Sequence, residues 1–166
     1  IPGLIYGENE ETFEMVIGKL LKEQRQTICT AESCTGGKIA QMITSIPGSS
    51  AYYKGSVIAY DNKVKTGFLG VPEDILENYG AVSEQVVKLM AEGARKLLNT
   101  DYSVATSGIA GPEGGTELKP VGTIWISVAS EKRTITEKYV FGSDRLININ
   151  RFAIAALNLV RKQIIS

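Results

Sequence analysis

The chain has 166 residues, with 18 basic and 18 acidic side chains and therefore no net charge, which argues against a general nucleic-acid binder. Hydrophobic residues make up 43% of it, an ordinary value for a globular domain once the glycines are counted with them. It contains no histidine, which excludes Ser-His-Asp triads, Cys-His pairs and histidine-ligated metal sites.

The cysteine content and the chain ends indicate the setting of the protein. Two cysteines, Cys29 and Cys34, are too few for a structural zinc site and are poorly spaced for a disulfide, which favours a reduced, cytoplasmic setting. No apolar run approaches the roughly 18 residues of a membrane span, and the first residues resemble no signal peptide. We expect residues 1–8 to be a linker from an upstream domain and residues 9–166 to form one domain.

Hydrophobic periodicity and turn residues predict the elements in chain order. Helices are predicted over about residues 9–23, through 39–46, from a cap at Asp61 or Asn62, from a cap at Ser83 and from 143–144. Strands are predicted at 27–31, 57–60, 104–106, 123–129 and 134–141. Helices and strands alternate before a final hairpin, which predicts an α/β fold with three α/β/α layers, a mixed, mostly parallel sheet and an antiparallel C-terminal hairpin.

Three segments follow predicted strands and carry polar or glycine-rich sequence, at residues 32–37, 60–65 and 106–115. Open α/β sheets bind ligands at the carboxyl ends of their strands. We therefore expect these three segments to meet at one rim of the sheet and to form the functional site.

The first segment offers two candidate nucleophiles. Ser33 precedes a predicted helix whose free N–H groups favour an anion or a developing oxyanion, although Ser33 could equally serve as a helix cap. Cys34 is the rival, because a thiol at a helix N-terminus has a lowered pKa, whereas most cysteines are small buried hydrophobes.

The second and third segments offer a base and an anion site. A serine nucleophile without histidine can use a desolvated lysine, and Lys63 and Lys65 follow the strand end, although most lysines are solvated. The loop at 106–115 lacks the dinucleotide fingerprint but could hold a phosphate or ribose through its N–H groups, or be a mobile surface loop. Arg145 opposes the dipole of the last helix, which weakly indicates an anionic ligand.

Several motifs, in order, resemble the C-terminal domain of the competence/damage-inducible protein CinA, over about residues 9–165. They are Thr30–Gly37, Pro47–Ser50, Tyr60–Asn62 with Lys65, Gly80–Ser83, Ser107–Gly115, Lys119–Thr123 and Gly142–Arg145. Stand-alone members of that family are nicotinamide mononucleotide amidohydrolases. The resemblance implies hydrolysis of the nicotinamide carboxamide, giving nicotinate mononucleotide and ammonia.

The resemblance also implies roles for individual residues. The nucleophile falls on Ser33, the base on Lys65 and a tyrosine on Tyr60. From the chemistry of these groups, we expect Ser33 and Lys65 to lie within hydrogen-bond reach or one water apart, with Tyr60 hydrogen-bonded to one of them. If no lysine serves as the base, Glu32 is the next candidate. The residues expected to bind substrate are Thr35, Gly36, Gly37, Thr106, Gly108, Ala110, Gly111 and Arg145.

We expect a mononucleotide substrate, a homo-oligomer and an upstream domain in the same chain, with no metal, cofactor, membrane or direct nucleic-acid partner. The competing hypothesis is a catalytically silent module that binds a nucleotide or docks on proteins of competence and the DNA-damage response. An intact set of Ser33, Tyr60 and Lys65 favours the enzyme, because a silent module has no evident need for all three.

Overall fold

A five-stranded mixed sheet forms the centre of the molecule, in the strand order β2-β1-β3-β4-β5. The computed structural model describes residues 11–166, so the linker expected at residues 1–8 lies outside the described residues. The strands are β1 (Ile28–Glu32), β2 (Tyr53–Ile58), β3 (Tyr102–Gly108), β4 (Thr123–Ser130) and β5 (Thr134–Val140). β2, β1 and β3 run parallel, and β4 and β5 continue the sheet antiparallel, which confirms the predicted mixed sheet and hairpin.

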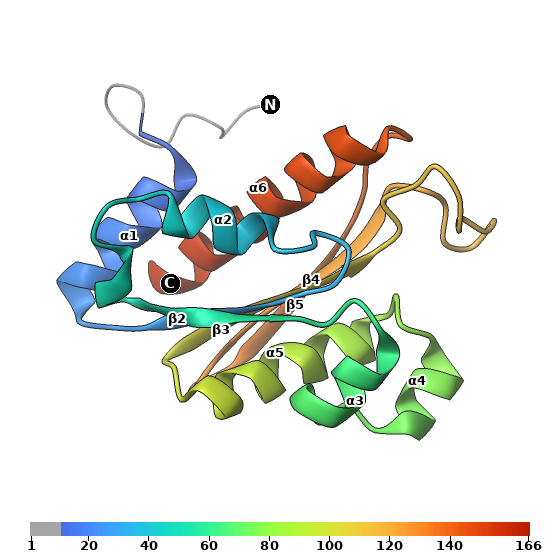
Figure 1. Cartoon of the computed structure of the whole chain (residues 1–166), viewed down its shortest axis with the longest axis horizontal. Coiled ribbons are helices and arrows are strands. Elements are labelled where there is room, and N and C mark those ends of the chain that lie inside the picture. Colours follow the sequence, from blue (N-terminus) through green and yellow to red (C-terminus); the bar gives the residue numbers. More distant parts are fainter. Residues whose placement is uncertain (1–10) are drawn as a thin grey trace.

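Helices cover both faces of this sheet, as the three-layer prediction requires (Figure 1). The helices on one face are α1 (Phe13–Gln24), α2 (Lys38–Thr44) and α6 (Arg145–Ile164), and those on the other are α3 (Asn62–Leu69), α4 (Glu73–Tyr79) and α5 (Glu84–Leu98). A short 3-10 turn, Ser49–Ala51, leads into β2. In the part of the chain that the structure describes, no helix is both long and apolar enough to cross a membrane.

Each face of the sheet has its own hydrophobic core. Ile17 of α1 and Phe152 of α6 are fully buried in one, and Val86 and Met90 of α5 are fully buried in the other. Burial of such a side chain stabilises the fold by about 1.5–3 kcal/mol relative to exposure. Because β1 lies between both cores, all five of its residues are buried, including Glu32.

Two elements differ from the sequence prediction. β2 begins at Tyr53 rather than near Val57. The sequence did not predict this start, because the edge strand is only partly buried and its Lys54-Gly55-Ser56 stretch shows no hydrophobic alternation. The helix α4 was not predicted; it is short, and its Ile75 and Leu76 pack against the core while only partly buried. Tyr60 therefore lies beyond the strand, in the loop that leads to α3.

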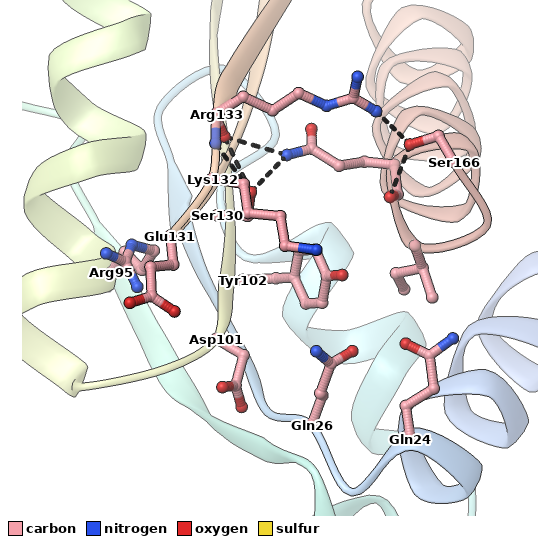
Figure 2. A pocket seen from close by; sticks show the side chains of 12 residues that line it. Gln24, Gln26, Arg95, Asp101, Tyr102, Ser130, Glu131, Lys132, Arg133 and Ser166 are labelled. Atoms are coloured by element: carbon pink, nitrogen blue, oxygen red, sulfur yellow. Dashed lines mark hydrogen bonds between the residues drawn. The ribbon is translucent and has the colours of Figure 1, made fainter.

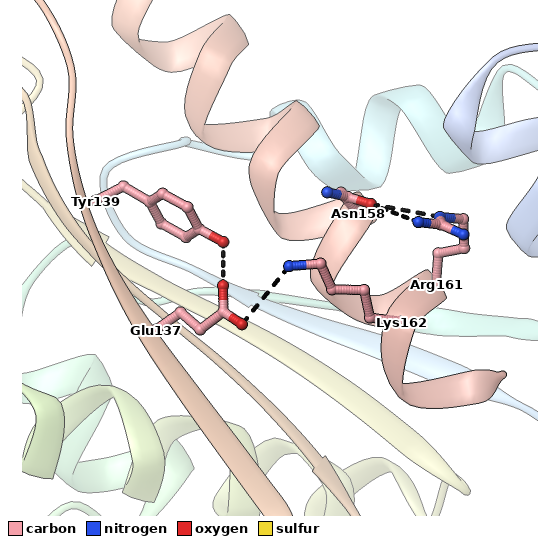
Figure 3. A network of polar contacts seen from close by, with 5 residues as sticks. All are labelled: Glu137, Tyr139, Asn158, Arg161 and Lys162. Atoms are coloured by element: carbon pink, nitrogen blue, oxygen red, sulfur yellow. Dashed lines mark hydrogen bonds and ion pairs between the residues drawn. The ribbon is translucent and has the colours of Figure 1, made fainter. Parts of the chain in front are cut away.

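Polar contacts join the last turns of α6 to the edge strand β5 (Figure 3). Lys162 Nζ lies 3.7 Å from Glu137 Oε1, and the Tyr139 hydroxyl donates to the other oxygen of that carboxylate. Burial and the neighbouring Glu137 carboxylate raise the pKa of Tyr139. Since both members of the ion pair are partly exposed, the pair itself contributes no more than about 1 kcal/mol.

Candidate active site

The carboxyl ends of the three parallel strands meet at one rim of the sheet. Glu32 at the end of β1 pairs with Ile58 of β2 on one side and with Thr106 of β3 on the other, so the loops after these strands start side by side. A cavity of about 200 Å³ opens at this rim. Its lining residues are Ser33, Cys34, Tyr60, Asn62, Lys65, Ala81, Val82, Ser107, Gly108, Ala110 and Arg145.

The cavity contains only part of the expected residue set. The expected residues that line it are Ser33, Tyr60, Lys65, Gly108, Ala110 and Arg145. Those that do not are Thr35, Gly36, Gly37, Thr106 and Gly111. The three segments thus converge as the sequence predicted, but the turn after Ser33 does not contribute its glycines to the cavity wall.

The start of α2 is occupied by a carboxylate from the protein itself. Glu32 is fully buried, and its side chain accepts hydrogen bonds from the N–H groups of Gly37 (3.0 Å), Ile39 (3.0 Å) and Ala40 (2.8 Å). The N–H group of Gly36 donates to the Ser33 carbonyl oxygen at 3.1 Å. The expectation that Gly36, Gly37 and the helix start would receive an anion or oxyanion is therefore wrong.

The bonds to Glu32 also bear on its suggested role as a base. The Thr35 hydroxyl donates to Glu32 Oε2 at 2.7 Å, in addition to the three main-chain donors. Glu32 therefore acts as a structural cap of the turn that carries Ser33, with both carboxylate oxygens already accepting hydrogen bonds.

Thr35, Thr106 and Gly111 shape the rim from behind the cavity wall. The hydroxyl oxygens of Thr35 and Thr106 lie 2.9 Å apart, both buried, and so join the turn after β1 to β3. Gly111 has a φ of +92°, and a Cβ there would approach Val121 to 2.5 Å. These contacts hold the loops, and the expected role of the three residues in substrate binding stays a prediction.

Ser33 is held by its main chain, and its side chain remains available. Its N–H group donates to the Thr106 carbonyl oxygen at 3.1 Å, and the residue is half-buried. Within residues 11–166, the Ser33 hydroxyl has no hydrogen-bond partner, and no bond links it directly to Lys65. An arrangement with one water between the two groups stays a prediction.

Cys34 has the environment of a core residue. Burial raises the pKa of its thiol to about 12, and burial also raises the pKa of Cys29 to about 11. The lowered pKa expected for a thiol at a helix N-terminus is wrong here, because Glu32 neutralises that terminus and the thiol lies out of water. At neutral pH Cys34 is a protonated thiol and a poor nucleophile.

Lys65 is a buried cation at the cavity wall. Only 1% of its surface is exposed, and its ammonium donates to the carbonyl oxygens of Ala59 (2.8 Å) and Tyr60 (3.3 Å). Burial lowers the pKa of Lys65, an effect that the nearby Asp61 and Cys34 partly oppose. Lys63 of the same helix is exposed.

Tyr60 and Arg145 form a pair at the mouth of the cavity. Arg145 donates from Nη2 to the Tyr60 hydroxyl at 3.3 Å and from Nη1 to the Gly111 carbonyl oxygen at 2.7 Å. The Tyr60 side chain is 65% exposed. Its hydroxyl thus contacts Arg145, rather than Ser33 or Lys65 as expected, and the Arg145 guanidinium lines the cavity beside it.

Other residues of the site were not singled out from the sequence. Ser107 donates to the Ala81 carbonyl oxygen at 2.7 Å, which joins β3 to the segment before α5. Asn148 is fully buried and donates from Nδ2 to the carbonyl oxygens of Ala110 (2.9 Å) and Gly142 (2.8 Å). In the sequence, the only indication that Asn148 would hold the loop after β3 was its place on the inward face of a helix.

Glu32→Ala is expected to lower the free energy of unfolding by about 3 kcal/mol or more, because it leaves several buried N–H groups without an acceptor. Urea unfolding of the variant should show a lower midpoint with an unchanged slope. Glu23→Ala, an exposed site on α1, is the matched control and should leave the midpoint in place. A stable Glu32→Ala variant would show that the cap contributes little.

Comparisons with known proteins bear on the identity of the chain. The model of the CinA C-terminal domain family matches residues 10–164. A CinA-like protein of Cytophaga hutchinsonii is 54% identical over 96% of this chain, and a CinA-like protein of Thermotoga neapolitana is 47% identical over 96%. The chain spans 38% and 39% of the lengths of these two relatives.

Solved structures agree with the sequence match. The competence/damage inducible protein CihA from Agrobacterium tumefaciens superposes with a TM-score of 0.90 at 32% identity, over 95% of this chain and 97% of that one. A CinA superfamily protein from Klebsiella pneumoniae superposes with a TM-score of 0.88 at 28% identity, over 92% and 95%. With its sheet order, its rim and its motifs, this chain belongs to the CinA C-terminal domain family.

Proposed function

We propose that this domain hydrolyses the carboxamide of nicotinamide mononucleotide to nicotinate mononucleotide and ammonia, with Ser33 as nucleophile and Lys65 as base. One observation carries the proposal. A serine hydroxyl without a partner among the described residues and a buried lysine with a lowered pKa line the same cavity. This pair supplies the two groups that amide hydrolysis needs in a chain without histidine.

The hydrogen bonds of Lys65 suit it to act as a base. A neutral amine has two hydrogens and one lone pair, and two carbonyl oxygens, of Ala59 and Tyr60, already accept from this nitrogen. The remaining position on the tetrahedral Lys65 nitrogen carries a hydrogen in the ammonium form and a lone pair in the amine form. Loss of a proton therefore leaves both bonds intact and directs the lone pair away from the two carbonyl groups.

In the proposed reaction, the Lys65 amine takes the Ser33 proton as the serine oxygen attacks the carboxamide carbon. The tetrahedral intermediate collapses with cleavage of the C–N bond, and the Lys65 ammonium gives the proton to the departing amide nitrogen, which leaves as ammonia. Water then hydrolyses the acyl-serine ester by the same proton path. The peptide groups of Cys34 and Thr35 donate to no main-chain carbonyl among the described residues, and they replace Gly36 and Gly37 as candidate oxyanion donors.

The Arg145 guanidinium is the candidate group for the substrate phosphate. We expect Arg145→Ala to raise KM for nicotinamide mononucleotide about 10-fold to 100-fold with a smaller change in kcat, because a hydrogen bond to a charged group is worth about 1.5–3 kcal/mol. Steady-state kinetics would measure both constants. Arg151→Ala, an exposed position on the same helix, is the control. An unchanged KM would place the phosphate elsewhere.

The direct test of the proposal is an assay of ammonia and nicotinate mononucleotide after incubation of the chain with nicotinamide mononucleotide. We expect stoichiometric formation of both products, at the same rate with and without a chelator, since no step uses a metal. The absence of turnover by a folded chain that binds the mononucleotide would refute the proposal.

A second candidate is a catalytically silent nucleotide-binding or protein-interaction module linked to competence and the DNA-damage response. The lack of a direct bond between Ser33 and Lys65 favours it, and the name of the Agrobacterium protein refers to competence and damage. This module would bind the mononucleotide without releasing ammonia, so the same assay distinguishes the two candidates.

A further inference from the structure

Asn62 is a polar residue of the rim cavity to which the proposed reaction assigns no role. It is the first residue of α3, and it lines the cavity together with Lys65. Because residues three and seven positions apart lie on one face of a helix, Asn62 shares a face with Lys65 and Leu69, which are both buried. Asn62 therefore lies at the cavity end of the inward face of α3, about one turn from the proposed base.

The fold itself makes no use of the Asn62 side chain. The cap of α3 is Asp61, whose carboxylate accepts from the Lys63 N–H group at 2.7 Å. No hydrogen bond joins the Asn62 amide to any of residues 11–166, and the residue is exposed to solvent. An exposed amide without a partner, at the wall of a cavity, is available to a ligand.

The second and larger cavity of the chain, of about 410 Å³, provides a contrast (Figure 2). It opens where β1 and β3 begin, and the side-chain amide of Gln163 in its wall donates to Ser130 Oγ and to the Arg133 carbonyl oxygen, both at 3.1 Å. The amide group there joins elements of the protein to one another. The Asn62 amide joins nothing in the part of the chain that the structure describes.

The other hydroxyl and charged side chains of the rim cavity have partners, apart from the hydroxyl of Ser33, the proposed nucleophile. Lys65, Ser107 and Arg145 all donate to main-chain carbonyl oxygens, and Arg145 also donates to the Tyr60 hydroxyl. Lysine and arginine side chains can only donate. Asn62 therefore supplies the cavity with a side-chain carbonyl oxygen, an acceptor of a kind that none of these groups offers.

We infer that Asn62 binds the substrate carboxamide, with Oδ1 accepting a hydrogen bond from its NH2 group. The inference rests on the proposed function and names a residue that selects an amide as substrate. The bond would turn the leaving nitrogen toward α3, where Lys65 gives up its proton, and would leave the carbonyl oxygen for the peptide groups of Cys34 and Thr35. A primary carboxamide carries the donor that this contact needs, whereas the carboxylate of the product carries acceptors only.

Affinity measurements in a Ser33→Ala background test this contact without turnover. Calorimetric titrations with nicotinamide mononucleotide and with nicotinate mononucleotide give two dissociation constants for each variant. We expect Asn62→Ala to weaken binding of the amide by about 3-fold to 10-fold, because one neutral hydrogen bond is lost. Asn78→Ala, at an exposed asparagine of α4 outside the cavity, is the matched control and should change neither constant.

Asn62→Asp distinguishes a contact with the amide from a structural effect. Aspartate keeps the acceptor oxygen in nearly the same volume, so the amide should bind within about 3-fold of its affinity for the Ser33→Ala parent. The new carboxylate lies against that of nicotinate mononucleotide, which should therefore bind about 10-fold more weakly or worse. A structural role of Asn62 would change the affinities of both ligands alike, and that result would overturn the inference.

The possible outcomes also separate this inference from the proposed function. Ammonia release by the parent chain, with unaltered affinities in the Asn62 variants, would refute the contact and keep the reaction. The expected pattern of affinities without ammonia release would support the contact and refute the reaction. A folded chain that binds neither mononucleotide would refute both.

Discussion

Ser33→Ala is expected to lower kcat for nicotinamide mononucleotide by on the order of 10³-fold or more, because the variant has no oxygen with which to form the acyl intermediate. Cys34→Ala is expected to keep most of the activity. Burial raises the pKa of that thiol to about 12, so the side chain is a packing group, and its truncation costs stability rather than chemistry. Ammonia release measured on both variants provides the comparison.

The Ser50 side chain is exposed and lies outside the cavity, so Ser50→Ala is the control for replacing a serine by alanine. Binding of the substrate by Ser33→Ala should persist, which separates loss of chemistry from loss of fold. A chain that survives Ser33→Ala but is inactivated by Cys34→Ala or by a thiol reagent would reverse the assignment of the nucleophile.

Lys65→Ala and Lys65→Arg should both be inactive to a similar degree, since arginine keeps the charge but does not titrate. In the parent chain, burial lowers the pKa of Lys65, so the amine form becomes available at a lower pH than for an exposed lysine. We therefore expect kcat to rise with pH through an apparent pKa below the ordinary lysine value, as a pH profile of ammonia release would record.

The same pKa shift has a consequence for stability. Because the native state gives up the Lys65 proton at a lower pH than the unfolded chain, the free energy of unfolding should rise with pH between the two pKa values.

Lys63→Ala is the matched control for the activity of the Lys65 variants, because Lys63 is exposed on the same helix. Loss of activity in Lys63→Ala with retention in Lys65→Arg would move the base to Lys63.

The sequence predicted the architecture because its hydrophobic patterning is strong in most elements. The helix after Ser83 has an apolar face of buried residues, and β3 and β4 are buried over most of their length. The missed helix α4 and the early start of β2 are partly exposed elements at the margins of the fold, where hydrophobic patterning is weak. Tertiary contacts, rather than local sequence, determine such segments.

The convergence of Ser33, Tyr60 and Lys65 followed from topology, because parallel strands place their carboxyl ends at one edge. Arg145 was singled out only for its place in the first turn of the last helix, which did not predict that it would join them. The finer contacts did not follow. From the sequence, we expected the N–H groups at the start of α2 to bind a ligand, whereas the Glu32 carboxylate of the preceding strand accepts their hydrogen bonds. A side chain that lies in a buried strand gives no signal in sequence that it will cap the next helix.

The Glu32 cap also has a consequence for motion. The first amides of a helix ordinarily exchange their hydrogens quickly with solvent, because they have no acceptor within the helix. Here Gly37, Ile39 and Ala40 donate to a carboxylate on the fully buried strand β1. We therefore expect these three amides to exchange more slowly than the first amides of an uncapped helix. The exposed Tyr60 side of the cavity is the part left free to adjust to a ligand.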